Sequence, residues 1–324
     1  MDVVGFGALN IDIICKVDFN DFSFIEKGSE RKIREGELSF LKNTIEKKAK
    51  FVVKSGGGSA ANTIYALSKM GFCCGFVGKV GKDKEGDFIL KELEEAKVDI
   101  SEIKREGKTG ICFILVDERG ERSVLVLPGV NDTLTPDEVN LDYIKEAKIL
   151  HATSFVGDTS YITQKNAILK SENILSFDPG EPHASRGWEE LSPIIKKTYF
   201  FFSTEKEIKL LTGKNFEEGC TRLRDWGAKV VICKMGDKGS FLKSEKGEIF
   251  IPARKVKSID TTGAGDVYAA GFLAGFLRGL SLKNCGLVAT YAAAMSVTGY
   301  GREKYPDKDF LEYTIQNLSN ENGS

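Results

Sequence analysis

The sequence has few of the residues that build metal clusters or disulfide frameworks. It contains two histidines, His151 and His183, so a histidine-rich metal site is excluded. Its seven cysteines are an odd number, no pair has CxxC spacing, and adjacent Cys73 and Cys74 suit neither a zinc cluster nor an ordinary disulfide. Most cysteines stand in apolar runs, as Cys233 does, where the free thiol packs as a small hydrophobe. We therefore predict a reducing, cytoplasmic setting.

Long apolar runs and an excess of one charge are also missing. No apolar span of 18 residues occurs, and the N-terminus does not have the pattern of a signal peptide, so we expect neither a membrane span nor export. The net charge of -1 is unlike that of a nucleic-acid binder, and we expect no nucleic-acid partner. With 41% hydrophobic residues over 324 positions, the chain can bury the core of one large α/β domain or two small ones.

Three catalytic motifs are absent. The Walker pattern GxxxxGK[ST] does not occur, so the chain is not a P-loop protein. No GxSxG elbow supports a serine hydrolase. The Gly5-Phe6-Gly7 run has no third glycine and no acidic residue on a following strand, which makes a dinucleotide-binding oxidoreductase a weak alternative.

Strands and helices alternate from about residue 130 onward. This alternation predicts an α/β fold with a mostly parallel central sheet flanked by helices. We expect one such domain over residues 1–310, followed at 311–324 by the end of a helix and a frayed tail. The expected strands cover 148–153, 173–178, 198–202, 229–234 and 239–243, and the expected helices cover 160–170, 188–196, 204–212, 216–225, 265–278 and 282–297.

The first half of the chain carries a second pattern. A hairpin is expected over 109–116 and 122–127, with its turn at 117–120, and it interrupts the alternation. Together with the extended residues 10–17 it predicts a small separate sheet, a natural lid over a nucleotide domain. We assign residues 12–54 and 109–130 to this lid. The remaining early elements are a buried strand at 3–7, helices near 37–48, 61–71 and 84–97, and a strand at 73–80.

The strongest functional pattern is Asp260-Thr261-Thr262-Gly263-Ala264-Gly265-Asp266, which precedes an apolar helical run. A small-residue turn that opens a helix leaves amide N–H groups facing outward, and these suit a phosphate. Asp266 is then placed to accept a proton from an attacking hydroxyl beside the amides that hold the moving charge. The alternative is a helix-start acid that only complements the helix dipole.

This pattern resembles the C-terminal signature of the PfkB, or ribokinase-like, family of sugar and nucleoside kinases. The resemblance spans residues 3–310 and implies the ribokinase-like fold. It implies that Asp266 is the catalytic base. It also implies that Gly263, Ala264 and Gly265 form an anion hole for the transferred phosphoryl group.

A second stretch, residues 56–62, is similar to the family's N-terminal signature of glycines, small residues and asparagine. The resemblance implies that Gly57 and Gly58 bind the sugar through their backbone and that Asn62 binds it through its amide. Asn10 and Asp12 match the first-strand motif, in which both side chains bind substrate hydroxyls. The alternatives are a flexible glycine turn at 56–58 and an ordinary polar strand end.

The donor side rests on shorter matches. Thr204 and Glu207 resemble the family's N-x-x-E element, in which the glutamate orders water around Mg²⁺, although Thr204 replaces the asparagine and is also a good helix N-cap. Lys234 follows a strand and is expected either at a donor phosphate or at a solvent-facing strand end. The other residues that we assign to the donor nucleotide are Gly236, Gly239, Thr261, Gly263, Gly265 and Thr290.

Three further features are left with alternatives. The resemblance allows a monovalent cation near Asp260 and Thr262. Asp178-Pro179-Gly180 resembles a family turn, and for the neighbouring Arg186 a surface salt bridge is favoured over a substrate contact. The 43 residues between Asp12 and Gly56 are a long insertion that enlarges the lid, shapes substrate choice or supports a homodimer.

The sequence thus predicts an ATP-dependent, Mg²⁺-assisted kinase for a hydroxyl of a small sugar or nucleoside. A ribose-containing acceptor is slightly favoured, while fructose or a sugar phosphate, ribose 1-phosphate, inositol and a keto-sugar acid stay open, as does ADP as donor. The alternative of another class is a sugar- or nucleotide-binding sensor on the same fold that has lost its chemistry.

Overall fold

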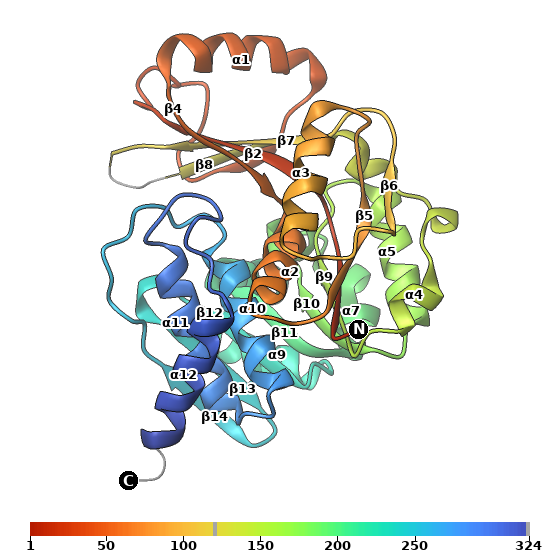
Figure 1. Ribbon diagram of the computed structural model, residues 1–324, viewed down its shortest axis with the longest axis vertical. Coiled ribbons are helices and arrows are strands. Elements are labelled where there is room, and N and C mark those ends of the chain that lie inside the picture. Colours follow the sequence, from red (N-terminus) through yellow and green to blue (C-terminus); the bar gives the residue numbers. More distant parts are fainter. Residues whose placement is uncertain (119–121, 322–324) are drawn as a thin grey trace.

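The computed structural model describes residues 1–118 and 122–321 of the chain. It contains a nine-stranded sheet with helices on both faces and a five-stranded sheet that lies above it (Figure 1). The predicted hairpin turn at 117–120 and the predicted tail at 311–324 both extend beyond the described residues. Among the described residues, no helix combines the length and apolar character that a membrane crossing requires.

The large sheet confirms the predicted parallel arrangement. Neighbouring strands are parallel from β6 to β12, and the last two strands form an antiparallel edge. The order is β14 (Gly247–Ile251), β13 (Ser240–Ser244), β12 (Val230–Lys234), β11 (Thr198–Thr204), β10 (Ile174–Asp178), β9 (Ile149–Thr153), β1 (Val3–Phe6), β5 (Cys74–Val80) and β6 (Ile103–Arg105).

These strands form because their apolar residues can be buried on both faces. In β11, Phe200 and Phe202 pack on one face, and Phe201 packs on the other. The first face carries α2 (Ser59–Lys69), α3 (Lys84–Glu95), α10 (Ala264–Leu277), α11 (Leu282–Ser296) and α12 (Lys308–Glu321). The second face carries α4 (Leu141–Lys145), α5 (Asp158–Lys170), α7 (Gly187–Lys197), α8 (Glu205–Thr212) and α9 (Phe216–Asp225), with α6 (Gly180–Ala184) against α7 and α8.

The small sheet is the lid that the sequence predicts, and it has two strands that the sequence pattern did not reveal, β3 and β4. Its order is β3 (Glu30–Lys32), β8 (Arg122–Leu127), β7 (Gly110–Val116), β2 (Asn10–Lys16) and β4 (Lys50–Gly57). The long insertion supplies β3, α1 (Glu35–Lys48) and β4. Leu41 and Ile45 of α1 pack with Phe113 and Leu125 on one face of this sheet. The insertion therefore enlarges the lid and covers its outer face.

Candidate active site

The two glycine-rich signatures meet where α2 and α10 pack side by side beneath the lid (Figure 1). The Asn62 amide donates a hydrogen bond from Nδ2 to Oδ2 of Asp266 at 2.9 Å. Thr63 Oγ1 donates to the Asp266 backbone carbonyl at 3.1 Å. Residues that lie about 200 positions apart in the sequence are thus in direct contact, as both motif assignments require.

The turn before α10 has the conformation that its glycine content predicts. Gly263 is the N-cap of the helix, with a φ of 74°, a left-handed conformation that glycine adopts at little cost. A Cβ at this position would lie 2.4 Å from the Tyr305 hydroxyl oxygen. The backbone of residues 263–265 then enters α10 with Asp266 in its first turn. The first amides of a helix have no partners within it and suit an anion, although the Ala264 N–H donates to the Thr261 carbonyl at 3.3 Å.

Asp12 lies on the lid strand β2, opposite the other glycine signature. Asn10 pairs with Gly57 across the β2–β4 ladder. A Cβ on Gly57 would lie 2.1 Å from Cγ of Asp12, so the carboxyl group packs directly on the glycine backbone. Gly58 has a φ of 100° and opens α2. Asn62 lies on this helix. The structure therefore brings Asp12, Gly57 and Gly58 together with Asn62.

Asn10 is about as buried as Asp12, and its side chain is held by hydrogen bonds. Its Oδ1 accepts a hydrogen bond from Nδ2 of Asn131 at 2.9 Å. The Asn131 side chain also bonds to the Leu9 backbone, through N–H at 2.8 Å and carbonyl at 2.9 Å. Asn131 escaped sequence reasoning because it lies in a short 3-10 turn with no recognisable motif. The side-chain oxygen Oδ1 of Asn10 is thus held by a hydrogen-bond network that supports the start of β2.

Burial changes the acidity of both candidate carboxylates. It raises the pKa of Asp266 to about 7, against the hydrogen bond from Asn62 and the charge of Lys234. Burial also raises the pKa of Asp12 to about 7, with Arg302 opposing and Asp266 adding to the increase. A carboxylate whose pKa lies near neutrality is well matched to accept a proton from a hydroxyl group. Both groups can therefore change protonation state around neutral pH.

On the donor side, the carboxyl ends of three parallel strands meet. Asp178 ends β10 and Lys234 ends β12, and their side chains form an ion pair. A Cβ on Gly265 would lie 3.3 Å from Nζ of Lys234, so the ammonium group adjoins the start of α10. Burial works against the charge of Lys234, but Asp178 and Glu207 outweigh it and raise the pKa. The side chain is 13% exposed, so Lys234 is not a solvent-facing strand end.

Thr204 and Glu207 form a capping box at the start of α8. Thr204 Oγ1 accepts from the Glu207 backbone N–H at 3.3 Å, and Glu207 Oε2 accepts from the Thr204 N–H at 2.7 Å. The N-cap interpretation of Thr204 is therefore confirmed. Burial, together with the charge of Asp178, raises the pKa of Glu207. Among the described residues no three acidic, histidine or cysteine side chains form a metal cluster.

The remaining donor-side residues lie around the β12–β13 turn and on α11. Gly236 and Gly239 frame a 3-10 turn (Gly236–Lys238) in which the Met235 N–H donates to the Gly239 carbonyl at 2.9 Å. Thr290 is buried on α11, and its Oγ1 has no partner within the described chain. Thr261 is exposed at the turn before α10. The Gly239 N–H also donates to the Gly236 carbonyl at 3.1 Å, while no hydrogen bond among the described residues links the β12–β13 turn to Thr261 or Thr290.

Sequence reasoning missed the segment after α11, residues 299–305, which reaches both signatures. The Gly301 N–H donates to Oδ2 of Asp260 at 3.1 Å. Arg302 Nε donates to Oδ1 of Asn62 at 3.1 Å, and its Nη1 contacts Oε2 of Glu92 at the same distance. The available signal was the glycine pair Gly299 and Gly301 directly before an arginine. The segment therefore belongs to the site.

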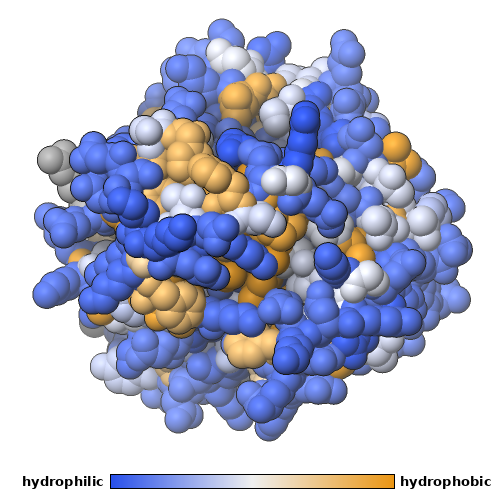
Figure 2. Space-filling model, turned by 90° about the horizontal axis from the view of Figure 1, so that it is seen from above, coloured by the Kyte–Doolittle hydropathy of each residue, from blue (hydrophilic) through white to orange (hydrophobic). Residues whose placement is uncertain are grey.

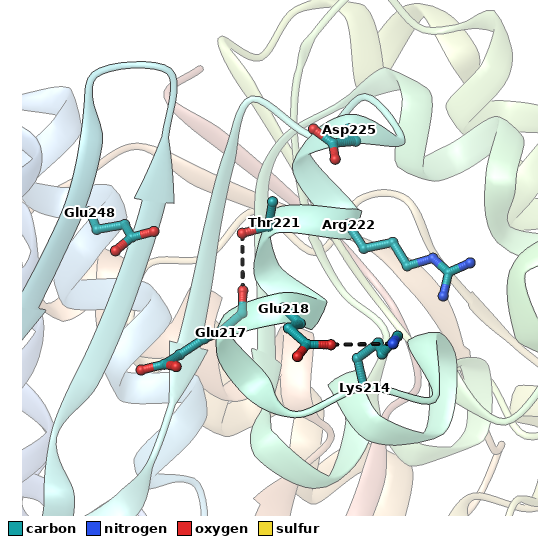
Figure 3. A pocket seen from close by; sticks show the side chains of 7 residues that line it. All are labelled: Lys214, Glu217, Glu218, Thr221, Arg222, Asp225 and Glu248. Atoms are coloured by element: carbon teal, nitrogen blue, oxygen red, sulfur yellow. Dashed lines mark hydrogen bonds and ion pairs between the residues drawn. The ribbon is translucent and has the colours of Figure 1, made fainter.

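Two other features lie apart from this constellation. Arg186 pairs with Asp158 at 2.7 Å and with Glu190 at 3.2 Å, which confirms its salt-bridge interpretation. A surface concavity of about 660 Å³ lies between α9 and β14, and Lys214 pairs there with Glu218 at 3.3 Å. Figure 3 shows the side chains that line it. Exposed, mutually paired charges of this kind are typical of a solvated surface. Its lining residues are Lys214, Glu217, Glu218, Thr221, Arg222, Asp225 and Glu248.

Similarity to known proteins agrees with this geometry. Residues 29–307 match the profile of the pfkB family carbohydrate kinases. A protein of Archaeoglobus fulgidus named as an uncharacterized sugar kinase is 37% identical over 245 residues, which are 74% of this chain and 98% of that protein. The ATP-dependent ribose-1-phosphate kinase of Halopiger xanaduensis is 31% identical over 258 residues, which are 79% of this chain and 85% of that protein.

The fold has close structural counterparts. The crystal structure of adenosine kinase from Sinorhizobium meliloti superposes with a TM-score of 0.87 at 23% identity, over 98% of this chain and 99% of that one. At this identity the likeness shows the fold alone. The predicted ribokinase-like α/β fold with a second, small sheet is thereby confirmed.

Proposed function

The chain belongs to the pfkB family of carbohydrate kinases, and from this membership we propose a specific reaction. The γ-phosphoryl group of ATP is transferred to a hydroxyl of a small sugar or nucleoside, with a ribose-containing acceptor favoured. Asp266 is the base. The observation that carries the assignment is the position of this carboxylate, which has a pKa of about 7 and lies in the first turn of a helix opened by a left-handed glycine.

The chemistry follows from this arrangement. Asp266 accepts the proton of the acceptor hydroxyl while the oxygen of that hydroxyl attacks the γ-phosphorus. The bond from this phosphorus to the departing ADP oxygen breaks. The amides of Gly263, Ala264 and Gly265 stabilise the charge that spreads over the phosphoryl oxygens. The Asn62 amide, bonded to Asp266 at 2.9 Å, keeps the carboxylate oriented. Closure of the lid excludes water as a competing acceptor.

The other residues take roles on either side of this base. Asn10, Asp12 and Asn62 bind acceptor hydroxyls together with the Gly57 and Gly58 backbone, and Asn131 holds Oδ1 of Asn10. Lys234, at the end of β12 and beside the start of α10, binds the donor phosphates. We assign the donor nucleotide to Thr204, Gly236, Gly239, Thr261 and Thr290 as well.

Two ions are part of the proposal. Mg²⁺ commonly keeps several waters and binds through one or two carboxylates and substrate phosphates, which fits Glu207 beside Asp178. When bound, it neutralises charge on the donor phosphates. A monovalent cation near Asp260 and Thr262 fits one feature, because Thr262 Oγ1 is buried with no partner among the described residues. Both Asp260 oxygens already accept backbone N–H bonds, from Thr262 at 2.9 Å and Gly301 at 3.1 Å.

The proposal also includes a cytoplasmic location and several other acceptors. All seven cysteines are free, which fits a reducing cytoplasm. Ribose 1-phosphate, fructose, inositol and keto-sugar acids are tested beside nucleosides, since the Halopiger relative is named for ribose 1-phosphate. ADP is tested as a second donor.

The experiment is a panel assay. The protein is mixed with ATP and Mg²⁺ and with each acceptor in turn, and ADP release is measured. We expect turnover with at least one acceptor and a loss of roughly a hundredfold or more in kcat for Asp266→Asn, with binding kept. Asp309→Asn, an acid in the first turn of α12, is the matched control and should keep full activity. Binding of sugar or nucleotide without any ADP release would favour the sensor alternative.

A further inference from the structure

Arg302 is a buried cation in the segment that follows α11. Its side chain is 5% exposed, although arginine is rarely buried without a partner. The guanidinium meets Asn62 through Nε at 3.1 Å, meets Glu92 through Nη1 at 3.1 Å, and lies 4.7 Å from the centre of the Tyr65 ring. Three residues on two helices, α2 and α3, therefore hold this side chain in one orientation.

The backbone around Arg302 is anchored as firmly as its side chain. The Gly301 N–H bonds to Asp260, which directly precedes the α10 turn, at 3.1 Å. The Tyr305 carbonyl accepts from Nζ of Lys69 on α2 at 3.2 Å. Glu92 is fixed too, because its Oε2 accepts from the Gly56 N–H at 2.7 Å. Arg302 thus connects the starts of both glycine signatures.

The chemistry of these groups determines which way the Asn62 amide points. A guanidinium has donors only, so its Nε must meet the carbonyl oxygen of the amide. The amide nitrogen then faces Asp266, whose carboxylate accepts its N–H at 2.9 Å. Without Arg302 the amide could turn over and present its oxygen to Asp266, an arrangement that disfavours the ionised carboxylate.

We propose that Arg302 is a positioning residue for phosphoryl transfer. It fixes the Asn62 amide so that its N–H, and not its carbonyl, faces the Asp266 carboxylate. The positive charge of Arg302 also acts on Asp12 on the acceptor side. There it opposes the increase in the pKa of Asp12 that burial causes. The assignment rests on the proposed function, in which Asp266 must be ionised before the acceptor hydroxyl can lose its proton.

Other charges face the same carboxylates and have to stay constant in a test. Asp266 is also influenced by Lys234 on β12, Asp178 on β10 and Arg122 on β8. Asp12 is also influenced by Asp266, Asp260 and Glu92. Substitutions at Arg302 and Glu92 leave all the other groups in place. The Arg302 substitutions change the partner of the Asn62 amide and a charge that acts on Asp12. Glu92→Gln removes a negative charge that acts on Asp12.

The test compares Arg302→Met, Arg302→Lys and Glu92→Gln in the full-length protein. The first readout is kcat against pH with ATP and an acceptor from the panel. The second is the titration of Asp12 and Asp266 by carboxyl-carbon NMR on protein labelled at aspartate, with Asp266→Asn and Asp12→Asn to assign the signals. Arg278→Met is the control, because Arg278 caps the far end of α10 and forms an exposed pair with Glu312.

For Arg302→Met we expect kcat at pH 7 to fall roughly 10- to 100-fold, because the base is no longer oriented. The midpoint of the acid limb in the plot of kcat against pH should move up by about one pH unit. The midpoint of the Asp266 titration should move up equally, since a hydrogen bond to the charged carboxylate is lost. Arg302→Lys should recover part of this loss. Glu92→Gln should move the Asp12 midpoint the opposite way, because a negative neighbour is removed.

The proposal is overturned if Arg302→Met melts at a lower temperature while the pH profile and both carboxyl midpoints stay those of the wild type. If Arg302→Met does not fold, Arg302→Lys and Glu92→Gln decide, and unchanged midpoints in both would overturn it equally. Absence of turnover in the wild type would defeat the proposed function instead. The NMR titration would still show whether Arg302 controls Asp266.

Discussion

At the residue scale, Asp266 combines the position that we propose for the catalytic base with a cost to stability. Burial raises its folded pKa to about 7, while an unfolded aspartate titrates near 3.8. The folded state therefore binds more protons than the unfolded state between these values, and stability is lost as pH rises through this window. A destabilising buried carboxylate of this kind is typical of active sites, where function and stability oppose each other.

Asp266→Asn should therefore stabilise the protein while it removes activity. The melting temperature of the variant should exceed that of the wild type by at least about 2 °C at pH 8, and the difference should shrink towards pH 4. Differential scanning calorimetry without ligands, run at both pH values, gives the measurement. Asp309→Asn should show no such pH-dependent gap. An equal difference at both pH values would argue against a buried, ionised Asp266.

Gly57 is a residue whose size matters directly. A methyl group there would lie 2.1 Å from the Asp12 carboxyl carbon and would displace it. We expect Gly57→Ala to raise the KM for the acceptor at least about tenfold and to leave the KM for ATP nearly unchanged. Gly36→Ala on α1 has open space around it and should only stabilise the helix. Equal changes in both KM values would contradict the assignment of Gly57 to the acceptor side.

The sequence predicted site residues where several of them lie in one short motif. Asp266 and Asn62 each stand in such a stretch, and the structure bonds them to each other. Arg302, Asn131 and Glu92 were not predicted, because the residues that they contact lie far away in the sequence. Nothing in local composition distinguishes Arg302 from the many surface arginines.

At the element scale, long periodic elements were predictable and short ones were not. The helices over 84–97, 216–225 and 282–297 were located to within two residues of their observed ends. The three-residue strands β3 and β6 were missed, since their pairing with β8 and β5 alone makes them strands. β4 was missed because its two lysines and two glycines obscure the strand pattern, although it pairs with β2.

The helix of the insertion should stabilise the lid in particular. Leu41 of α1 is 3% exposed and packs with Phe113 and Leu125 of the lid sheet. Leu41→Ala should cost about 2–4 kcal/mol of local stability, because it leaves a cavity between helix and sheet. Hydrogen exchange should then quicken in β2, β7 and β8 and stay unchanged in β9 to β12. Faster exchange throughout the chain would show that the lid does not unfold separately.

At the scale of the whole molecule, the outer face of the lid sheet is not free for a partner subunit. Cys15, Phe113 and Leu125 on its outer face are buried under α1 and the preceding loop. Asp12 on the opposite face points towards the site, together with the apolar Ile14, Cys112 and Ile114. Seen from the lid side, the surface is mostly hydrophilic with separate apolar patches (Figure 2). The homodimer that the insertion suggested would thus have to use other surfaces.

We therefore expect the protein to be a monomer of about 36 kDa, the mass of one chain. A stable dimer needs roughly 800 Å² of well-packed surface from each partner. Phe24 and Phe40, whose ring centres lie 5.3 Å apart, and Phe51 on β4 are the phenylalanines that the insertion leaves exposed. Light scattering behind size-exclusion chromatography, across a range of concentrations, gives the mass. A dimer that Phe40→Ser dissociates would show instead that α1 both covers the lid and presents a contact to a second copy.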